Sequence, residues 1–237
     1  MQLHTLPVEC EILLCIFNRQ DDKLRLVQDH KPQERVTTHE TMQRCDCAAI
    51  LAKNSVYLYK HQAKPLKQCI KKLFVLDFEA TCEKNEIVSP QEIIEFPCLV
   101  LNSTSYNIEA KFHKYVKPKF NPISPFCTEL TGIAPGTVEN ESEFPEVFEQ
   151  FTKWLEMQLQ TGTPEEMIFV TCGNWDLKSM LPRQCALYNL TIPEAMRRWI
   201  NLKVAFYQNT GYFPRGLVDM HKHLNLILSG RLHSGIG

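Results

Sequence analysis

The pattern of apolar and polar positions changes near residue 73 of this 237-residue chain. Residues 18–47 are polar and lack apolar periodicity, which is typical of a linker or a loose segment. The apolar stretches on either side of that segment do not distinguish a strand from a helix. Beyond residue 73, short apolar runs alternate with polar turns. We therefore expect an N-terminal segment over 1–70, of unknown role, and a folded domain over 71–237.

Within the domain, the spacing of apolar residues predicts both strands and helices. Apolar residues from Phe144 to Leu155 recur three and four positions apart, which indicates one face of an amphipathic helix, with Ser142 as a possible cap. The other expected elements are strands over 73–79, 92–101, 112–116, 167–171 and 200–202 and helices over 175–187 and 217–226. Three strands followed by alternating strands and helices predict an α/β fold with a mixed sheet.

Two carboxylates stand at the end of the first predicted strand, Leu73 to Glu79. Residues two apart on a strand share a face, so Asp77 and Glu79 project to one side while Phe78 packs on the other. One interpretation is a strand that simply reaches water. The other is a site for a hard cation, Mg²⁺ or Mn²⁺, which prefers carboxylate oxygens.

A second acid and a late histidine are ambiguous when each is taken alone. Asp176 follows the predicted strand 167–171, so it is either a helix N-cap or a group at the same sheet edge as Asp77. His233 stands four residues before the last residue, where a histidine is most often merely exposed. Neither residue alone points to a function.

Composition narrows the class of protein. The formal net charge of −1 argues against a protein that coats duplex DNA, although single-stranded nucleic acid in a local groove is compatible with it. The ten cysteines include no CxxC pair, so we expect reduced, core-packed thiols in an intracellular protein, cytoplasmic or nuclear. No signal peptide or membrane span is expected. The lysines between 60 and 72 are either a solvated surface or an RNA-facing patch.

Taken together, the acids and the histidine resemble a known arrangement. Six ordered blocks carry it: Val75-Leu-Asp-Phe-Glu-Ala-Thr-Cys82, Gln91-Glu-Ile-Ile-Glu-Phe-Pro97, Phe126-Cys-Thr-Glu-Leu-Thr-Gly-Ile133, Cys172-Gly-Asn-Trp-Asp-Leu-Lys178, Trp199-Ile-Asn-Leu-Lys203 and His233-Ser-Gly-Ile236. The chain over roughly 70–237 resembles the DEDDh 3′–5′ exonucleases of the RNase T/DnaQ-like superfamily, in particular the Eri-type exoribonucleases. The resemblance implies an RNase H-like mixed sheet flanked by helices.

The resemblance also assigns roles to the acids and the histidine. Members of the family remove nucleotides from RNA 3′ ends with two divalent cations, so Mg²⁺ is the implied cofactor, with Mn²⁺ as an option. Asp77, Glu79 and Asp176 would bind the metals, and His233 would act as general base toward the attacking water.

Other residues receive more modest assignments. The resemblance makes Glu79, Ala80 and Thr81 contacts of the terminal nucleotide. Glu92 and Glu95 are expected to be structural or supporting acids. The segment Thr131-Gly-Ile133 is either a wall of the base pocket or a turn in the core, and Phe78, Phe126 and Trp175 are either core residues or stacking platforms.

One feature departs from the family pattern, in which the last block continues as Asp-Asp and a helix follows. Position 237 is Gly, so we expect the fourth acid and the final helix to be lacking, the second metal to bind weakly and activity to be impaired. An isoform, a gene-model error and an inactive paralogue would each give this ending. The alternative function is a non-catalytic module that binds RNA 3′ ends or a protein partner. The sequence leaves the oligomeric state open.

Overall fold

The strands of the sheet come from both halves of the domain. The computed structural model describes residues 70–226, and within that range the sheet has six strands. They are β1 (Lys72–Leu76), β2 (Glu79–Ala80), β3 (Ile93–Asn102), β4 (Ile108–Tyr115), β5 (Met167–Thr171) and β6 (Trp199–Asn201). The long strand β3 pairs antiparallel with β1, β2 and β4, whereas β1 pairs parallel with β5 and β5 parallel with β6. The expected mixed sheet is therefore confirmed.

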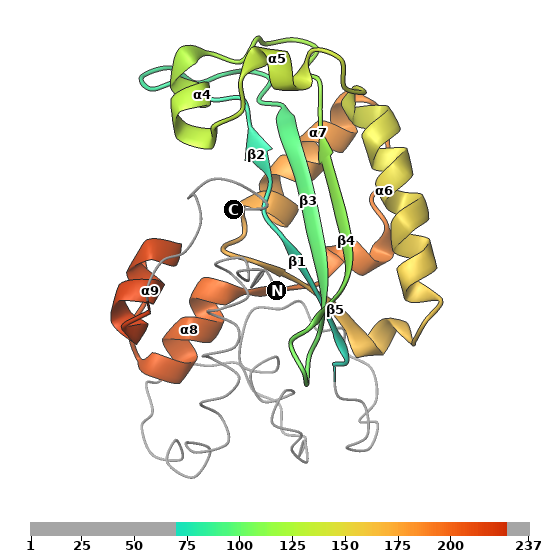
Figure 1. Cartoon of the computed structure of the whole chain (residues 1–237), viewed down its shortest axis with the longest axis vertical. Helices are drawn as coiled ribbons and strands as arrows, with labels where there is room; N and C mark the ends of the chain where they lie inside the picture. The colour runs from blue at the N-terminus through green and yellow to red at the C-terminus, as the bar shows by residue number, and fades with distance from the viewer. Residues whose placement is uncertain (1–69, 227–237) are drawn as a thin grey trace, which may run out of the picture.

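Helices cover both faces of this sheet, as Figure 1 shows. Side chains alternate along β1, so Phe74 and Leu76 enter one apolar cluster while Leu73 and Val75 enter another. The first cluster is closed by α6 (Phe144–Leu159) and α7 (Leu181–Leu187), and the second by α8 (Leu202–Thr210) and α9 (Leu217–Leu224). The sheet is thus the middle layer of three, as expected for an α/β fold.

A third, smaller cluster lies at one end of the sheet. It is built around α4 (Pro125–Thr131) and α5 (Pro135–Val138), which Figure 1 shows at the top of the molecule. Ser124 caps α4 by accepting a hydrogen bond from the Cys127 N–H, and Gly132 ends it in the left-handed conformation, with φ of 80°. Thr131 and Ile133 are buried beside this turn, whereas Gly132 is exposed.

Some expected elements have different bounds in the structure. The strand predicted over 73–79 is interrupted at Asp77 and Phe78, which separate β1 from β2. The helix predicted over 175–187 begins as a π-helix, η2 (Trp175–Met180), and continues as α7. Leu202 starts α8 instead of ending β6. The expectation that Ser142 caps α6 is wrong, because Glu143 is the N-cap and makes no side-chain capping bond.

The remaining elements are short. They are the 3₁₀ turns η1 (Pro164–Glu166) and η3 (Glu194–Arg197).

Five cysteines fall within residues 70–226, and all of them are free thiols, as expected. No helix in this range is long and apolar enough to cross a membrane. The predictions for 1–69, and those for the chain end from 227 to 237, lie outside the described residues.

Candidate active site

The two acids of the first motif lie on either side of an anchored aromatic ring. Phe78 is 3% exposed and packs edge-on against Phe96, with ring centroids 4.7 Å apart. Asp77 precedes this anchor and is partly exposed, and Glu79 follows it on β2 and is 7% exposed. Because Phe78 enters the core, the backbone on both sides of it is fixed, and with it the origin of both acidic side chains.

Asp176 is hydrogen-bonded directly to this segment. It lies in η2 just after β5, the strand that pairs parallel with β1, and it is 4% exposed. The Phe78 backbone N–H donates a hydrogen bond of 2.9 Å to Asp176 Oδ1. The N-cap of η2 is Asn174, so the interpretation of Asp176 as a cap is wrong. The structure instead brings Asp176 to the sheet edge that carries Asp77 and Glu79.

The environment of Asp176 changes its acidity. Burial raises the pKa of the Asp176 carboxyl to about 6, although the hydrogen bond from the Phe78 N–H and one from its own backbone N–H act in the opposite direction. A carboxylate kept in a poorly solvated place without a neutralising partner costs free energy. A cation at this position would lower that cost and would restore the ionised form at neutral pH.

The residues expected to contact substrate are held by a dense set of backbone bonds. Thr81 is 1% exposed, and its N–H donates to the Glu92 carbonyl oxygen at 2.8 Å. Its hydroxyl accepts from the Glu92 N–H at 2.9 Å, and its carbonyl oxygen accepts from Gln91 Nε2 at 3.0 Å. Ala80 pairs with Ile93 of β3 next to an irregularity in the register. This segment is therefore rigid before any ligand binds.

Glu92, which is hydrogen-bonded to Thr81 through its backbone, also holds a neighbouring loop with its side chain. Its carboxylate, on a residue 2% exposed, accepts hydrogen bonds from the backbone N–H groups of Lys119, Phe120 and Asn121 at 2.7, 2.9 and 2.8 Å. The Glu92 carboxylate therefore satisfies the backbone N–H groups of a loop of the protein itself. Glu92 has the structural role expected from the sequence.

The three acids are the right kind of ligands for a hard cation, because all of their donors are carboxylate oxygens. Within residues 70–226, however, no group of three or more His, Cys, Asp or Glu side chains is arranged so that it could hold a metal ion. His233 lies outside the described residues. Metal binding by Asp77, Glu79 and Asp176, and the role of His233 as a base, therefore stay predictions.

The Cys82 thiol and the Trp175 ring lie close in sequence to the acids, and the structure distinguishes their roles. Burial raises the pKa of the Cys82 thiol to about 12, with further contributions from Cys127 and from the charges of Glu79 and Glu83. This thiol stays protonated and is not a nucleophile. Trp175, at the start of η2, is 39% exposed and therefore remains available for stacking, whereas Phe78 belongs to the core.

Sequence reasoning did not find two polar contacts that bind the site elements together. Gln184 on α7 is fully buried, and its Oε1 accepts a hydrogen bond of 2.9 Å from the Ile93 N–H. His113 on β4 bonds to Glu95 on β3. A buried glutamine among the apolar positions of a helix, and a histidine within an alternating strand, were the available signals.

Comparisons with known proteins show the family of the chain. The model of the exonuclease family (RNase T type) matches residues 74–237. This chain belongs to the exonuclease family. It is 48% identical over 164 residues to the human protein named ERI1 exoribonuclease 3, covering 68% of this chain and 48% of the relative. It is 35% identical to 3′-5′ exoribonuclease 1 of the rat, covering 79% of this chain and 57% of the relative.

Solved structures give the same result for this exonuclease domain. The nuclease domain of 3′hExo, described as a DEDDh family member bound to rAMP, superposes with a TM-score of 0.63 at 33% identity, covering 70% of this chain and 85% of that one. The cell-death related nuclease 4 has a TM-score of 0.63 at 27% identity, covering 70% and 60%. The chain spans about half the length of the curated relatives named ERI1 exoribonuclease 3.

Proposed function

We propose that this chain is a metal-dependent 3′–5′ exoribonuclease that removes nucleotides from the 3′ ends of single-stranded RNA. The observation that carries the proposal is the hydrogen bond from the Phe78 N–H to Asp176 Oδ1, which joins the acid after β5 to the segment containing Asp77 and Glu79. Relatives that bear the name exoribonuclease support the choice of RNA.

In this proposal the acids and the neighbouring backbone divide the work. Asp77, Glu79 and Asp176 hold Mg²⁺ or Mn²⁺, which when bound lowers the pKa of a water molecule and stabilises charge on the phosphate. Glu79, Ala80 and Thr81 contact the terminal nucleotide. The backbone bonds of Thr81 support this role, because a preorganised contact loses little conformational entropy on binding.

His233 completes the proposal as the group that accepts a proton from the attacking water. An imidazole with a pKa near the ordinary value of about 6.5 is suited to that task near neutral pH.

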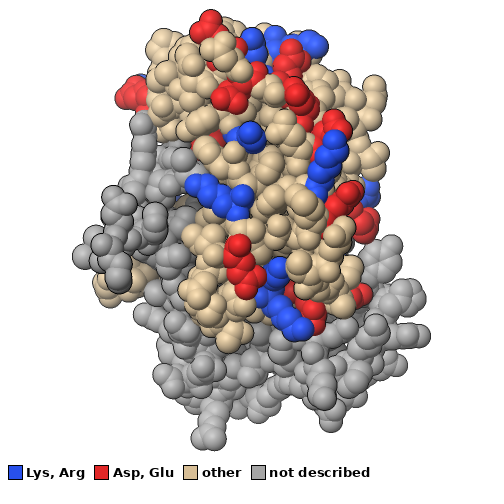
Figure 2. All heavy atoms as spheres, turned by 45° about the vertical axis from the view of Figure 1, so that its right-hand side comes forward, with Lys and Arg blue, Asp and Glu red and all other residues tan. Residues whose placement is uncertain are grey.

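Figure 2 shows basic and acidic side chains interspersed over the side of the molecule that carries α6. Such a mixed surface does not favour a nucleic-acid backbone, which is compatible with a substrate bound at the face with Asp77 and Glu79.

The test is degradation of a 5′-labelled single-stranded oligoribonucleotide with Mg²⁺ or Mn²⁺. We expect products shortened from the 3′ end, and no shortening when the 3′ hydroxyl is blocked or when EDTA is present. Asp77→Asn should abolish shortening, whereas Asp219→Asn, at a partly exposed acid on α9, is the matched control and should retain it. RNA that is bound but never shortened by the wild-type chain would contradict the proposal and support a non-catalytic binding role.

A further inference from the structure

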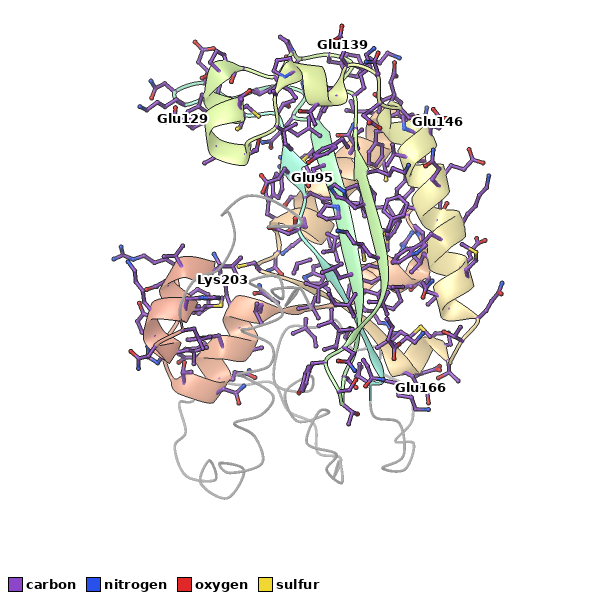
Figure 3. The ribbon with its side chains drawn as sticks, in the orientation of Figure 1. Glu95, Glu129, Glu139, Glu146, Glu166 and Lys203 are labelled. Carbon is purple, nitrogen blue, oxygen red and sulfur yellow. The ribbon has the colours of Figure 1, made fainter. Side chains whose placement is uncertain are left out.

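A hydrogen-bonded pair of ionisable groups lies beside the acids and has no task in the proposed mechanism. His113 Nε2 on β4 is 2.7 Å from Glu95 Oε1 on β3. Glu95 is 1% exposed, and the His113 side chain is 17% exposed. Figure 3 shows Glu95 over the sheet near β2, while Glu129, Glu139, Glu146 and Glu166 lie at the periphery.

The strand register places this pair next to Glu79. Glu95 is directly opposite Glu79 of β2 and, on its other side, directly opposite Tyr115 of β4. Directly opposite residues of an antiparallel pair project to the same face, with Cβ atoms about 4.5–5.5 Å apart. Two nearly buried carboxyl groups, those of Glu79 and Glu95, are therefore neighbours on the face that carries the site.

The His113 ring is itself held in place. It packs edge-on against Tyr115, with ring centroids 5.0 Å apart and an interplanar angle of 77°. Because His113 is on β4 and Glu79 is on β2, the bond to Glu95 Oε1 draws that carboxylate toward β4, away from the strand of Glu79. Like charges repel strongly where solvent is scarce, so the orientation of Glu95 affects where the Glu79 carboxylate comes to rest.

We propose that His113 is a positioning residue, which orients Glu95 by its hydrogen bond and thereby fixes the Glu79 carboxylate for metal and nucleotide. This inference rests on the proposed function, which gives Glu79 its task. Glu95 is 1% exposed, so loss of the imidazole takes a hydrogen bond from a buried carboxyl and is expected to lower stability as well as turnover. A substitution that restores the hydrogen bond separates the positioning role from a merely structural one.

The experiment compares His113→Leu, which removes the hydrogen bond at similar volume, with His113→Gln, whose amide nitrogen can replace Nε2. His223→Gln, an exposed histidine on α9, is the control. For each chain we would measure kcat and KM on a single-stranded oligoribonucleotide, the melting temperature without metal, and the rise in melting temperature on adding Mn²⁺.

For His113→Leu we expect kcat to fall about tenfold or more while KM changes less than about twofold. The Mn²⁺-induced rise in melting temperature should become smaller, because Glu79 is no longer held in place. The metal-free melting temperature should fall by about 2–8 °C, because a buried carboxyl loses a hydrogen bond. His113→Gln should recover kcat to within about threefold of the wild type, and His223→Gln should behave as the wild type.

Wild-type kcat and a full Mn²⁺ response in His113→Leu would overturn the role of His113 alone. So would a His113→Gln variant as defective as His113→Leu, because the hydrogen bond would then not be the cause. A wild-type chain with neither RNA shortening nor a Mn²⁺ response would refute the proposed function first, and the role of His113 with it. If His113→Leu does not fold, His113→Asn, whose amide is too short to reach Glu95, replaces it under the same criteria.

Discussion

Replacing Asp176 by Asn should stabilise the metal-free protein at neutral pH while it removes activity. The pKa of this carboxyl is raised from 3.8 to about 6, chiefly by burial. At about 1.4 kcal/mol per pH unit, the ionised form costs the fold about 3 kcal/mol at pH 7. An amide carries no charge and still offers one oxygen to the Phe78 N–H.

The net gain is smaller than the full cost of the charge, because the introduced asparagine has one acceptor oxygen where the aspartate has two. Asp176 also accepts from its own backbone N–H, and losing that bond costs about 1 kcal/mol. We therefore expect Asp176→Asn to be more stable than the wild type by about 2 kcal/mol at pH 7. The advantage should shrink as the pH falls through 6 toward 4, because the wild-type carboxyl is then protonated in the folded state.

Urea unfolding followed by tryptophan fluorescence, in EDTA at pH 7 and at pH 4.5, measures the stability difference between Asp176→Asn and the wild type and its change with pH. Asp219→Asn is the control of opposite sign: Asp219 is partly exposed, and the pKa of its carboxyl is lowered by bonds from the Arg215 N–H and the Tyr212 hydroxyl. That variant should not gain stability at pH 7. An Asp176→Asn chain that is less stable than the wild type at pH 7, or equally favoured at both pH values, would refute the reasoning.

Three further changes test the framework around the site. Glu92→Gln should lower the free energy of unfolding by about 1–3 kcal/mol in a urea titration, because a charged acceptor of three backbone N–H groups is lost. The control Glu139→Gln, at an exposed position, should change the same free energy by less than about 0.5 kcal/mol. Gln184→Leu should cost about 1–3 kcal/mol, since the Ile93 N–H loses its buried acceptor, and faster amide exchange at Ile93 would report it. Gly132→Ala should cost about 1–2 kcal/mol in thermal unfolding, because φ is 80° at this C-cap.

The sequence predicted the parts of the fold that depend on periodicity. The apolar runs over 92–101 and 167–171 became β3 and β5, and the stripe from Phe144 to Leu155 became the buried face of α6. Those signals are strong because each such element buries a whole face against a core. Short elements such as α5 (Pro135–Val138), with four residues, contain too few positions to define a period.

The candidate site was predicted in part, for a related reason. Asp77, Glu79 and Asp176 could be placed at one sheet edge because the carboxyl ends of the parallel strands β1 and β5 meet there. The contact between His113 and Glu95 depends instead on the register of two antiparallel strands, and a shift of one residue would turn one of the side chains to the other face. A single sequence does not fix that register.

Together these contacts explain how an acidic site can exist in the metal-free fold. Glu92 gives its charge to three backbone N–H groups, Glu95 is bonded to His113, and Asp176 accepts the Phe78 N–H at the cost of a raised pKa. The first two acids already have partners, whereas burial acts against the charge of Asp176. Of these three acids, Asp176 is therefore the one whose ionised form is disfavoured by burial, and a cation bound beside it would lower that cost.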